Sequence, residues 1–230
     1  MKMKALKAAF PCTIPVMTGY LFLGTAYGIY MRVSGFAFWY PLLTSIVVFG
    51  GSLEFVIVTM LLAPFAPLAA FVMALLIQAR HLFYGIAMLD KYRDLGRKRY
   101  YLIYALTDET FSLNYAADIP EDTDRGWFMF FVSLLDHLYW ISGATLGGLL
   151  GSLISFDTEG ISFVMTAMFT VIFLEQLLKE KMHYSSLIGL LSSVLCLYLF
   201  GKNGFLVPAM LMIMLLLTLF RRSIGEGEGS

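Results

Sequence analysis

Apolar residues fall in long runs along this chain instead of on one face of a helical or strand period. A helix needs about 20 apolar residues to span the hydrocarbon core of a bilayer. An open sheet in that environment would leave backbone polar groups unsatisfied. The pattern therefore predicts an all-α, polytopic transmembrane helical bundle with seven or eight membrane segments. The segments expected are 10–30, 39–63, 67–89, 100–116, 127–153, 161–178, 184–200 and 205–220.

Two of these segments contain residues that disfavour a straight helix. Gly50, Gly51 and Ser52 lie in the middle of the second segment, where they weaken a helix and free backbone polar groups. The fourth segment is short and carries Asp108 and Glu109. We expect a broken or re-entrant helix at each of these two places.

Basic residues near the segment ends bear on topology, because cytoplasmic loops carry an excess of Lys and Arg. Lysines place the N-terminus in the cytoplasm, and Arg221 and Arg222 place the C-terminus there too. Eight simple crossings satisfy both ends but leave the five basic residues of 91–100 outside. Either this loop departs from the tendency, or an earlier segment does not cross. The second segment is the first candidate because of its central glycines.

Composition supports a single membrane domain. Of the 230 residues, 59% are hydrophobic and 14% are charged, and the mean hydropathy is +0.78, whereas about 25% of a soluble domain is charged. The formal net charge of zero argues against a nucleic-acid partner. We expect one transmembrane transporter domain at 1–222, in contact with the lipid bilayer, and a flexible polar tail at 223–230. No cofactor is expected.

Two stretches echo one another. LFLGTAYGI (21–29) and WISGATLGG (140–148) both contain G-x-x-x-G, a pattern that lets membrane helices approach closely. A Leu-Glu pair follows each stretch at a similar distance, ending at Glu54 and Glu175. Transporters are often built from repeats, so an internal repeat is considered. The expected helix-packing residues are Gly24, Gly28, Gly143 and Gly147.

Polar residues inside apolar runs are the candidate functional groups, because a charge at the bilayer centre costs about 2.5–3.5 kcal/mol. The substrate-binding candidates are Gly50, Gly51, Ser52, Glu54, Gln78, Arg80 and Tyr84. The candidates for proton coupling or ion pairs are Glu54, His81, Asp108, Glu109, Asp136 and His137. Plainer alternatives are close packing at the glycines, an Arg80 that snorkels toward 91–100, a helix cap at Thr107 or Asp108, and an interfacial aromatic belt at Trp140.

The chemistry of these groups suits a charged or zwitterionic ligand. Freed N–H groups at the start of a half-helix suit a carboxylate, and freed carbonyls suit an ammonium group. On one helix, Gln78, His81 and Tyr84 would form a polar strip. Arg80 can bind a carboxylate of a substrate or of Asp108, and His81 can carry protons near neutral pH. Asp108 and Glu109 would point in different directions and find different partners.

Four motifs in order resemble one family of permeases. The motifs are VFGGSLEFVIVTML (48–61), ARHLFYGIAM (79–88), LTDETF (106–111) and SGATLGG (142–148). Over residues 8–220 the chain is similar to the AzlC-type permeases, the large subunits of the branched-chain amino acid exporter (LIV-E) family. The resemblance implies export of valine, leucine and isoleucine, with methionine as a further candidate. It also implies proton coupling and a small four-span membrane subunit of the AzlD type.

The chain departs from that family pattern at two positions. The pattern has Gln where this chain has Glu54, and Asp or Asn where it has Gln78. Relative to the family pattern, this chain therefore has an acidic residue at position 54 and lacks one at position 78. Our hypothesis is that Glu54 either contacts the ammonium group of the substrate or is the titrating group of proton coupling.

These features predict a secondary transporter of the bacterial cytoplasmic (inner) membrane that works by alternating access, with a cytoplasmic N-terminus. It is expected not to be an enzyme. One alternative is a membrane assembly or structural subunit that does not transport. The other is an intramembrane metalloenzyme, since His81, His137, Asp108 and Asp136 can bind metals. The sequence contains no H-E-x-x-H motif or cysteine pair, so no metal site is expected.

Overall fold

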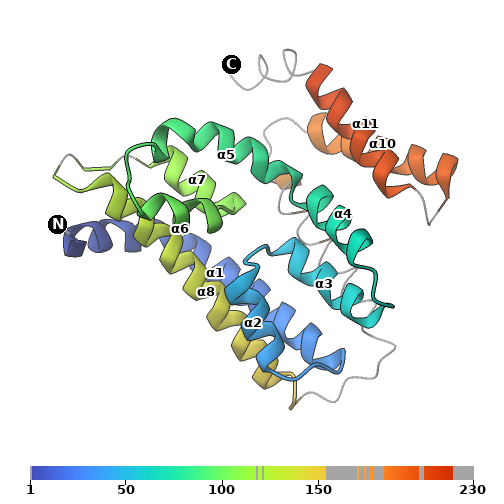
Figure 1. Cartoon of the computed structure of the whole chain (residues 1–230), viewed down its shortest axis with the longest axis horizontal. Coiled ribbons are helices and arrows are strands. Elements are labelled where there is room, and N and C mark those ends of the chain that lie inside the picture. The colour runs from blue at the N-terminus through green and yellow to red at the C-terminus, as the bar shows by residue number, and fades with distance from the viewer. Residues whose placement is uncertain are drawn as a thin grey trace. The chain divides into compact units, whose positions relative to one another are not determined.

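A computed structural model of the chain describes residues 2–117, 119–120, 122–153, 170, 174, 177–178, 184–201 and 205–219. The chain divides into two compact units, Met1–Ile161 and Ser162–Ser230. The regular secondary structure of these described residues is helical, as predicted (Figure 1). The first unit contains α1 (Lys2–Val33), α2 (Trp39–Val47), α3 (Ser52–Leu62), α4 (Pro67–Ile77), α5 (Ala79–Tyr92), α6 (Lys98–Tyr104), α7 (Asp108–Ala116) and α8 (Arg125–Leu150); the second contains α10 (Tyr184–Phe200) and α11 (Leu206–Leu219).

Helices α1 and α8 form the central pair of the first unit and run parallel to each other. Lys2 lies over the ring of Trp127 near the start of α8. At the other end, the side chain of Arg32 lies beside Gly151. Figure 1 shows the two helices side by side along most of their length. Both are long and apolar enough to cross a membrane.

Glycines form the contact between these two helices, and the contacts are reciprocal. A Cβ atom added to Gly24 would lie 3.2 Å from the Cα of Gly143, and one added to Gly143 would lie 3.2 Å from the Cα of Gly24. A Cβ on Gly28 would overlap with backbone of α8, and a Cβ on Gly147 would overlap with backbone of α1. The predicted glycine packing is confirmed. Because each glycine contacts the other helix in the same way, a local two-fold axis relates residues 21–29 of α1 to residues 140–148 of α8.

The second predicted segment, 39–63, is broken at the glycines, as expected. Helix α2 starts near Gly148 and ends near His137, so it runs antiparallel to α8. The chain then turns through 48–51, where Phe49 has a positive φ of 42°, a conformation that is strained for a residue with a side chain. Helix α3 leads away from this turn. The segment is therefore a helical hairpin and not a straight span.

The fourth predicted segment is a second hairpin. Helix α6 starts near Trp127 and runs along the N-terminal half of α8. After 105–107 the chain reverses into α7, whose Asn114 donates a hydrogen bond to Ser133 of α8. Thr107 caps α7 by accepting from the backbone N–H of Thr110, in a capping box. The cap that the sequence offered as a plainer reading is therefore present.

The third predicted segment is one path that bends by 50° between α4 and α5. Pro67 starts α4 at a position where its missing N–H costs nothing. The break falls at Gln78, which lies outside both helices. The expected polar strip is therefore wrong in part, because Gln78 does not share a helix with His81 and Tyr84.

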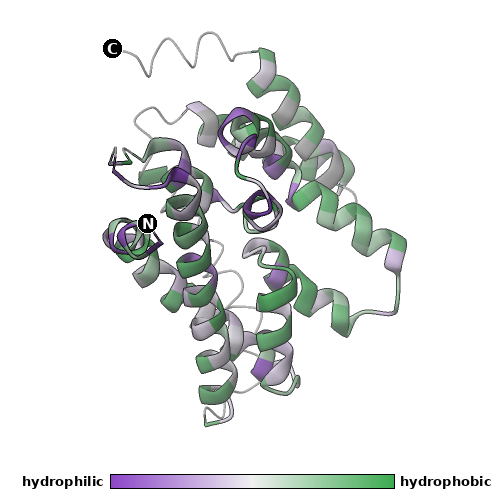
Figure 2. Cartoon of the chain, turned by 60° about the vertical axis from the view of Figure 1, so that its left-hand side comes forward, coloured by the Kyte–Doolittle hydropathy of each residue, from purple (hydrophilic) through white to green (hydrophobic). Residues whose placement is uncertain are grey.

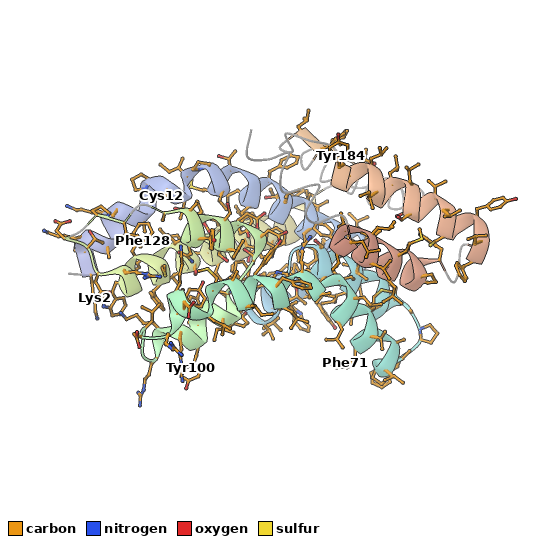
Figure 3. All side chains as sticks on the ribbon, turned by 90° about the horizontal axis from the view of Figure 1, so that it is seen from above. Lys2, Cys12, Phe71, Tyr100, Phe128 and Tyr184 are labelled. Atoms are coloured by element: carbon orange, nitrogen blue, oxygen red, sulfur yellow. The ribbon has the colours of Figure 1, made fainter. Side chains whose placement is uncertain are left out.

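The first hairpin explains on which side of the first unit the basic residues of 91–100 lie. Lys98 and Lys2 both lie over the ring of Trp127, with Nζ 4.6 and 4.4 Å from its centroid. Residues 91–100 therefore lie at the same end of the first unit as the N-terminus. Figure 3 shows Lys2 and Tyr100 toward one end and Phe71 toward the other. The eight simple crossings are wrong, because 39–63 turns back.

Apolar side chains cover the outside of the helices. Hydrophobic residues predominate along them in Figure 2, and α4 contains no buried residue. In the described residues, two helices are long and apolar enough to span a membrane, or three if the bent pair α4–α5 is one span. Helices α10 and α11 occupy the predicted segments 184–200 and 205–220. Most of segment 161–178 and the tail 223–230 lie outside the described residues.

Candidate functional site

Three helix breaks meet in the middle of the first unit. The side-chain amide of Gln78 donates to the carbonyl of Gly50 at 3.5 Å, which joins the α4–α5 break to the first hairpin. Arg80 then joins α5 to both hairpins. Its Nη2 lies 3.3 Å from Oγ of Ser52 and 3.0 Å from Oδ2 of Asp108. The N-termini of α3, α5 and α7 therefore converge, and each brings the positive end of a helix dipole.

Glu54 stabilises the turn of the first hairpin from the first turn of α3. Its side chain is fully buried. Oε1 accepts hydrogen bonds from the backbone N–H of Gly50 at 3.1 Å and from Nε1–H of Trp140 at 2.8 Å. Oε2 is buried and has no hydrogen-bond partner. One carboxylate oxygen is thus structural, and the other remains available.

Arg80 and Asp108 form the ion pair that the sequence offered as one option. Their side chains are 39% and 33% exposed, so the pair is only partly shielded from its surroundings. Because Arg80 reaches toward α3 and α7, it does not snorkel toward the basic loop. Asp108 and Glu109 have different partners, as predicted, since Glu109 accepts a hydrogen bond from Tyr20.

Four buried polar atoms in this cluster have no hydrogen-bond partner in the described residues. They are Oε2 of Glu54, Oε1 of Gln78, Nε of Arg80 and Oδ1 of Asp108. Buried polar groups without a partner are rare in proteins. Here they comprise three acceptors and one donor beside three helix N-termini. A ligand with both an anionic and a cationic group would satisfy them.

An apolar cavity of about 670 Å³ adjoins this polar cluster. Its walls come from α4, α5, 48–49 and 103–106, and Gln78 and His81 supply polar lining. Nδ1 of His81 lies 3.3 Å from the carbonyl oxygen of Gln78. Tyr84 does not line the cavity but stacks on Phe111 of α7, with ring centroids 4.5 Å apart. The volume falls within the range of about 300–1,000 Å³ that is usual for small-molecule sites.

A second group of acidic residues, Glu109 and Asp136, has partners and surroundings other than Arg80. The hydroxyl of Tyr20 donates to Oε2 of Glu109 at 2.6 Å and contacts Oγ1 of Thr107 at 2.8 Å. Asp136 on α8 is fully buried, and neither of its carboxyl oxygens has a hydrogen-bond partner. The sequence placed Glu109 and Asp136 among the coupling candidates, and in the structure neither of them forms the ion pair with Arg80, which falls to Asp108.

His137 has an evident structural function. Its Nε2 lies 3.0 Å from the carbonyl oxygen of Ser45, near the end of α2, and its Nδ1 lies 3.0 Å from the hydroxyl of Tyr101. A neutral ring with the proton on Nε2 donates to the carbonyl and accepts from the tyrosine. The ring also stacks on Phe49, with centroids 4.2 Å apart. His137 therefore ties the two hairpins to α8.

Two residues of the site were not among the predicted ones. Trp140 holds Glu54, whereas the sequence offered Trp140 only as part of an interfacial aromatic belt. Tyr20 holds Glu109, but nothing in the sequence distinguishes it from the other tyrosines, of which the chain has 13 in all. Across the described residues, no three His, Cys, Asp or Glu side chains are grouped so that they could hold a metal ion.

Comparison with known proteins identifies the family. The model of the AzlC protein family matches residues 15–154. The branched-chain amino acid transport protein AzlC of Bacillus subtilis (strain 168) is 54% identical over 226 residues, which cover 98% of this chain and 89% of the relative. No solved structure matches the chain significantly.

Two further relatives carry less specific names. A protein of Haemophilus influenzae named as an uncharacterized membrane protein is 50% identical, over 94% of this chain and 89% of its own length. A protein of Helicobacter pylori (strain J99) with the same name is 39% identical, over 96% of this chain and 97% of its own length. With the family match spanning more than half of its length and relatives aligned along nearly all of it, the chain belongs to the AzlC protein family.

Proposed function

We propose that this chain is the large subunit of a permease that exports branched-chain amino acids across the bacterial cytoplasmic membrane in exchange for protons. The name of the Bacillus subtilis relative supports the substrate class. The basic residues at one end of the first unit support a cytoplasmic N-terminus. The small four-span partner of the AzlD type is part of the proposal, from the family resemblance.

The unpartnered atoms of the Arg80 cluster carry this proposal, because they match the two charged groups of an amino acid. Nε of Arg80 lacks a partner and can donate to the substrate carboxylate. The ammonium group has three N–H donors, and Glu54, Gln78 and Asp108 each have one acceptor oxygen without a hydrogen-bond partner. Helix N-termini around the site add a favourable field for the carboxylate. Of the two functions considered for Glu54, this geometry favours contact with the ammonium group.

The apolar cavity supports a hydrophobic side chain on the substrate. It opens beside Gln78, so the polar end and the aliphatic end of one molecule can be held together. Each buried methylene contributes about 0.8 kcal/mol, which favours leucine and isoleucine over alanine. A charged side chain would lose its hydration against the leucine and isoleucine residues of the wall without gaining a partner.

The double contact of Arg80 suggests how binding can change the conformation. The substrate carboxylate competes with Asp108 for the guanidinium group. When Asp108 is released, the tip of the second hairpin loses its ion pair with α5, while Ser52 keeps the first hairpin in contact with Arg80. A ligand that loosens one hairpin and not the other shifts the balance between two states of access.

The decisive experiment is counterflow of labelled amino acids in proteoliposomes, with and without the small partner. We expect labelled leucine to accumulate in vesicles loaded with unlabelled leucine, valine or isoleucine, and not in vesicles loaded with lysine. Failure to exchange any aliphatic amino acid, in the presence of the partner, would overturn the proposal. An assembly subunit would instead lose partner binding in Arg80 variants while the assembled complex still bound amino acid.

A further inference from the structure

Asp136 lies in the interior of the first unit in a setting that a carboxylate rarely occupies. Its side chain has no exposed surface, and both of its oxygens lack hydrogen-bond partners. Among the ion pairs formed by the described residues, none includes Asp136. An ionised carboxylate in that setting is costly unless a cation or several donors satisfy it.

The groups that act on Asp136 come from three other helices. Tyr20 on α1, Glu109 on α7 and Tyr101 on α6 interact with it electrostatically. His137 is its neighbour on α8 and has both ring nitrogens engaged by Ser45 and Tyr101. None of these groups supplies a positive charge, although Arg80 of α5 acts on Glu109 together with Asp108. Two carboxyl groups therefore interact electrostatically, and the Tyr20 hydroxyl is bound to one of them, Glu109.

Two such carboxyl groups do not readily ionise together, because like charges in a dry interior repel strongly. The two groups interact through space, since neither oxygen of Asp136 has a hydrogen-bond partner, and one proton on either carboxyl lowers that cost. We propose that Glu109 and Asp136 together hold the proton that is exchanged for substrate, on two carboxyl groups other than the one that pairs with Arg80. The inference rests on the proposed function only in naming transport as the process that uses this proton.

The chain connects this acidic pair to the substrate cluster. Glu109 directly follows Asp108, and both lie in the first turn of α7. A proton taken up by the pair removes a negative charge beside the ion pair between Arg80 and Asp108. Because Tyr20 holds Glu109 and also contacts Thr107, the cap of α7, the same event alters the tip of the second hairpin. Protonation and substrate binding thus act on one short segment.

The test compares two transport assays of the same proteoliposomes, which contain the full chain with its small partner. Counterflow without a pH gradient needs substrate binding and movement but no net proton transfer. Accumulation driven by an imposed pH gradient needs both. We expect Asp136→Asn to keep counterflow and to lose the gradient-driven accumulation, and Glu109→Gln to behave similarly. Asp90→Asn, the same change on the exposed face of α5, should leave both assays unchanged.

Other outcomes would contradict the proposal. Gradient-driven accumulation that survives in Asp136→Asn would overturn it, as would loss of counterflow in a variant that elutes and melts as the wild type does. An infrared measurement gives a readout independent of transport: the band of a protonated carboxylic acid should be present at neutral pH and should lose intensity in Asp136→Asn but not in Asp90→Asn. The proposal would also be overturned if the infrared spectra of the wild type and of Asp136→Asn did not differ in this band. Absence of counterflow in the wild type would instead refute the proposed function.

Discussion

Arg80 and Asp108 form a 3.0 Å ion pair that links α5 to the first turn of α7. The same Nη2 atom of Arg80 lies 3.3 Å from Ser52 at the start of α3. One guanidinium group therefore bridges the tips of two hairpins that approach from opposite ends of the first unit. A single side chain is thus placed both to bind an anionic ligand and to hold the hairpins together.

Replacing Arg80 with Lys should impair substrate binding although the charge is kept. A lysine ammonium group is a point charge and lacks the planar fork of donors with which a guanidinium group binds a carboxylate at two points. Hydrogen bonds to charged groups contribute about 1.5–3 kcal/mol, so the apparent affinity measured in counterflow should fall by about ten- to a hundredfold. Arg93→Lys, on the exposed loop, is the matched control. Normal affinity in Arg80→Lys would remove Arg80 from the binding site.

Glu54→Gln separates the two functions considered for this residue. Glutamine retains an oxygen that can accept from Trp140 and Gly50, so the hairpin should stay folded. The second oxygen becomes an NH₂ group, which repels the ammonium group of the substrate. We expect a weaker apparent affinity for amino acid in counterflow, with the response to a pH gradient intact.

The opposite result would assign the other function to Glu54. If affinity were unchanged and the pH dependence of transport disappeared, Glu54 would be the coupling group, and the substrate ammonium would have to be held elsewhere. Expression level and elution from a sizing column serve as the check that each variant is folded.

The glycine contact between α1 and α8 should tolerate no added side chain. A methyl group on Gly28 would overlap with the backbone of Ala144 and Gly148, which cannot move aside as a side chain can. Overpacking of this kind typically costs about 1–3 kcal/mol, so Gly28→Ala should lower the melting temperature in detergent. Gly19→Ala, on the same helix but with open space around it, should leave it unchanged or raise it slightly. Equal melting temperatures would show that the helices pack differently.

The sequence predicted the features whose cause is local. Gly50 and Gly51 indicated a break because glycine weakens any helix, and Asp108 and Glu109 indicated different partners because adjacent helical residues point apart. The pairing of Arg80 with Asp108 followed from the rule that buried charges seek opposite charges. These inferences needed no knowledge of how the segments pack.

Features caused by contacts distant in sequence were not predicted. Gln78 occupies an apolar run that reads as continuous helix, and its break accompanies the contact with the carbonyl of Gly50 in another segment. Glu54 is held by Trp140, and Glu109 by Tyr20, across large separations in the chain. The return of 39–63 to its starting side also depends on packing against α1 and α8. The pattern of apolar and polar residues along the sequence gives no information on these contacts.

Asp124, which lies before α8 and outside the spans, should make the stability of the first unit depend on pH. Its side chain accepts a hydrogen bond from the backbone N–H of Trp127 at 2.7 Å and so caps the helix. This bond, with help from Lys98, holds the pKa of Asp124 below its ordinary value. The stabilisation is then present above the unfolded pKa of about 3.9. It is lost as the pH falls through the lower pKa of the folded state.

The matched variants are Asp124→Asn and Asp124→Ala, compared by thermal unfolding in detergent from neutral to acidic pH. Asparagine still caps a helix, so at neutral pH it should lose only the charge-dependent part, whereas alanine should cost about 0.5–2 kcal/mol. The difference between wild type and Asp124→Asn should shrink as the pH falls, because protonation removes the charge that asparagine lacks. A difference that stays constant with pH would mean that the cap acts through its hydrogen bond alone. The pair with Lys98, 3.4 Å long and partly exposed, would then contribute nothing measurable.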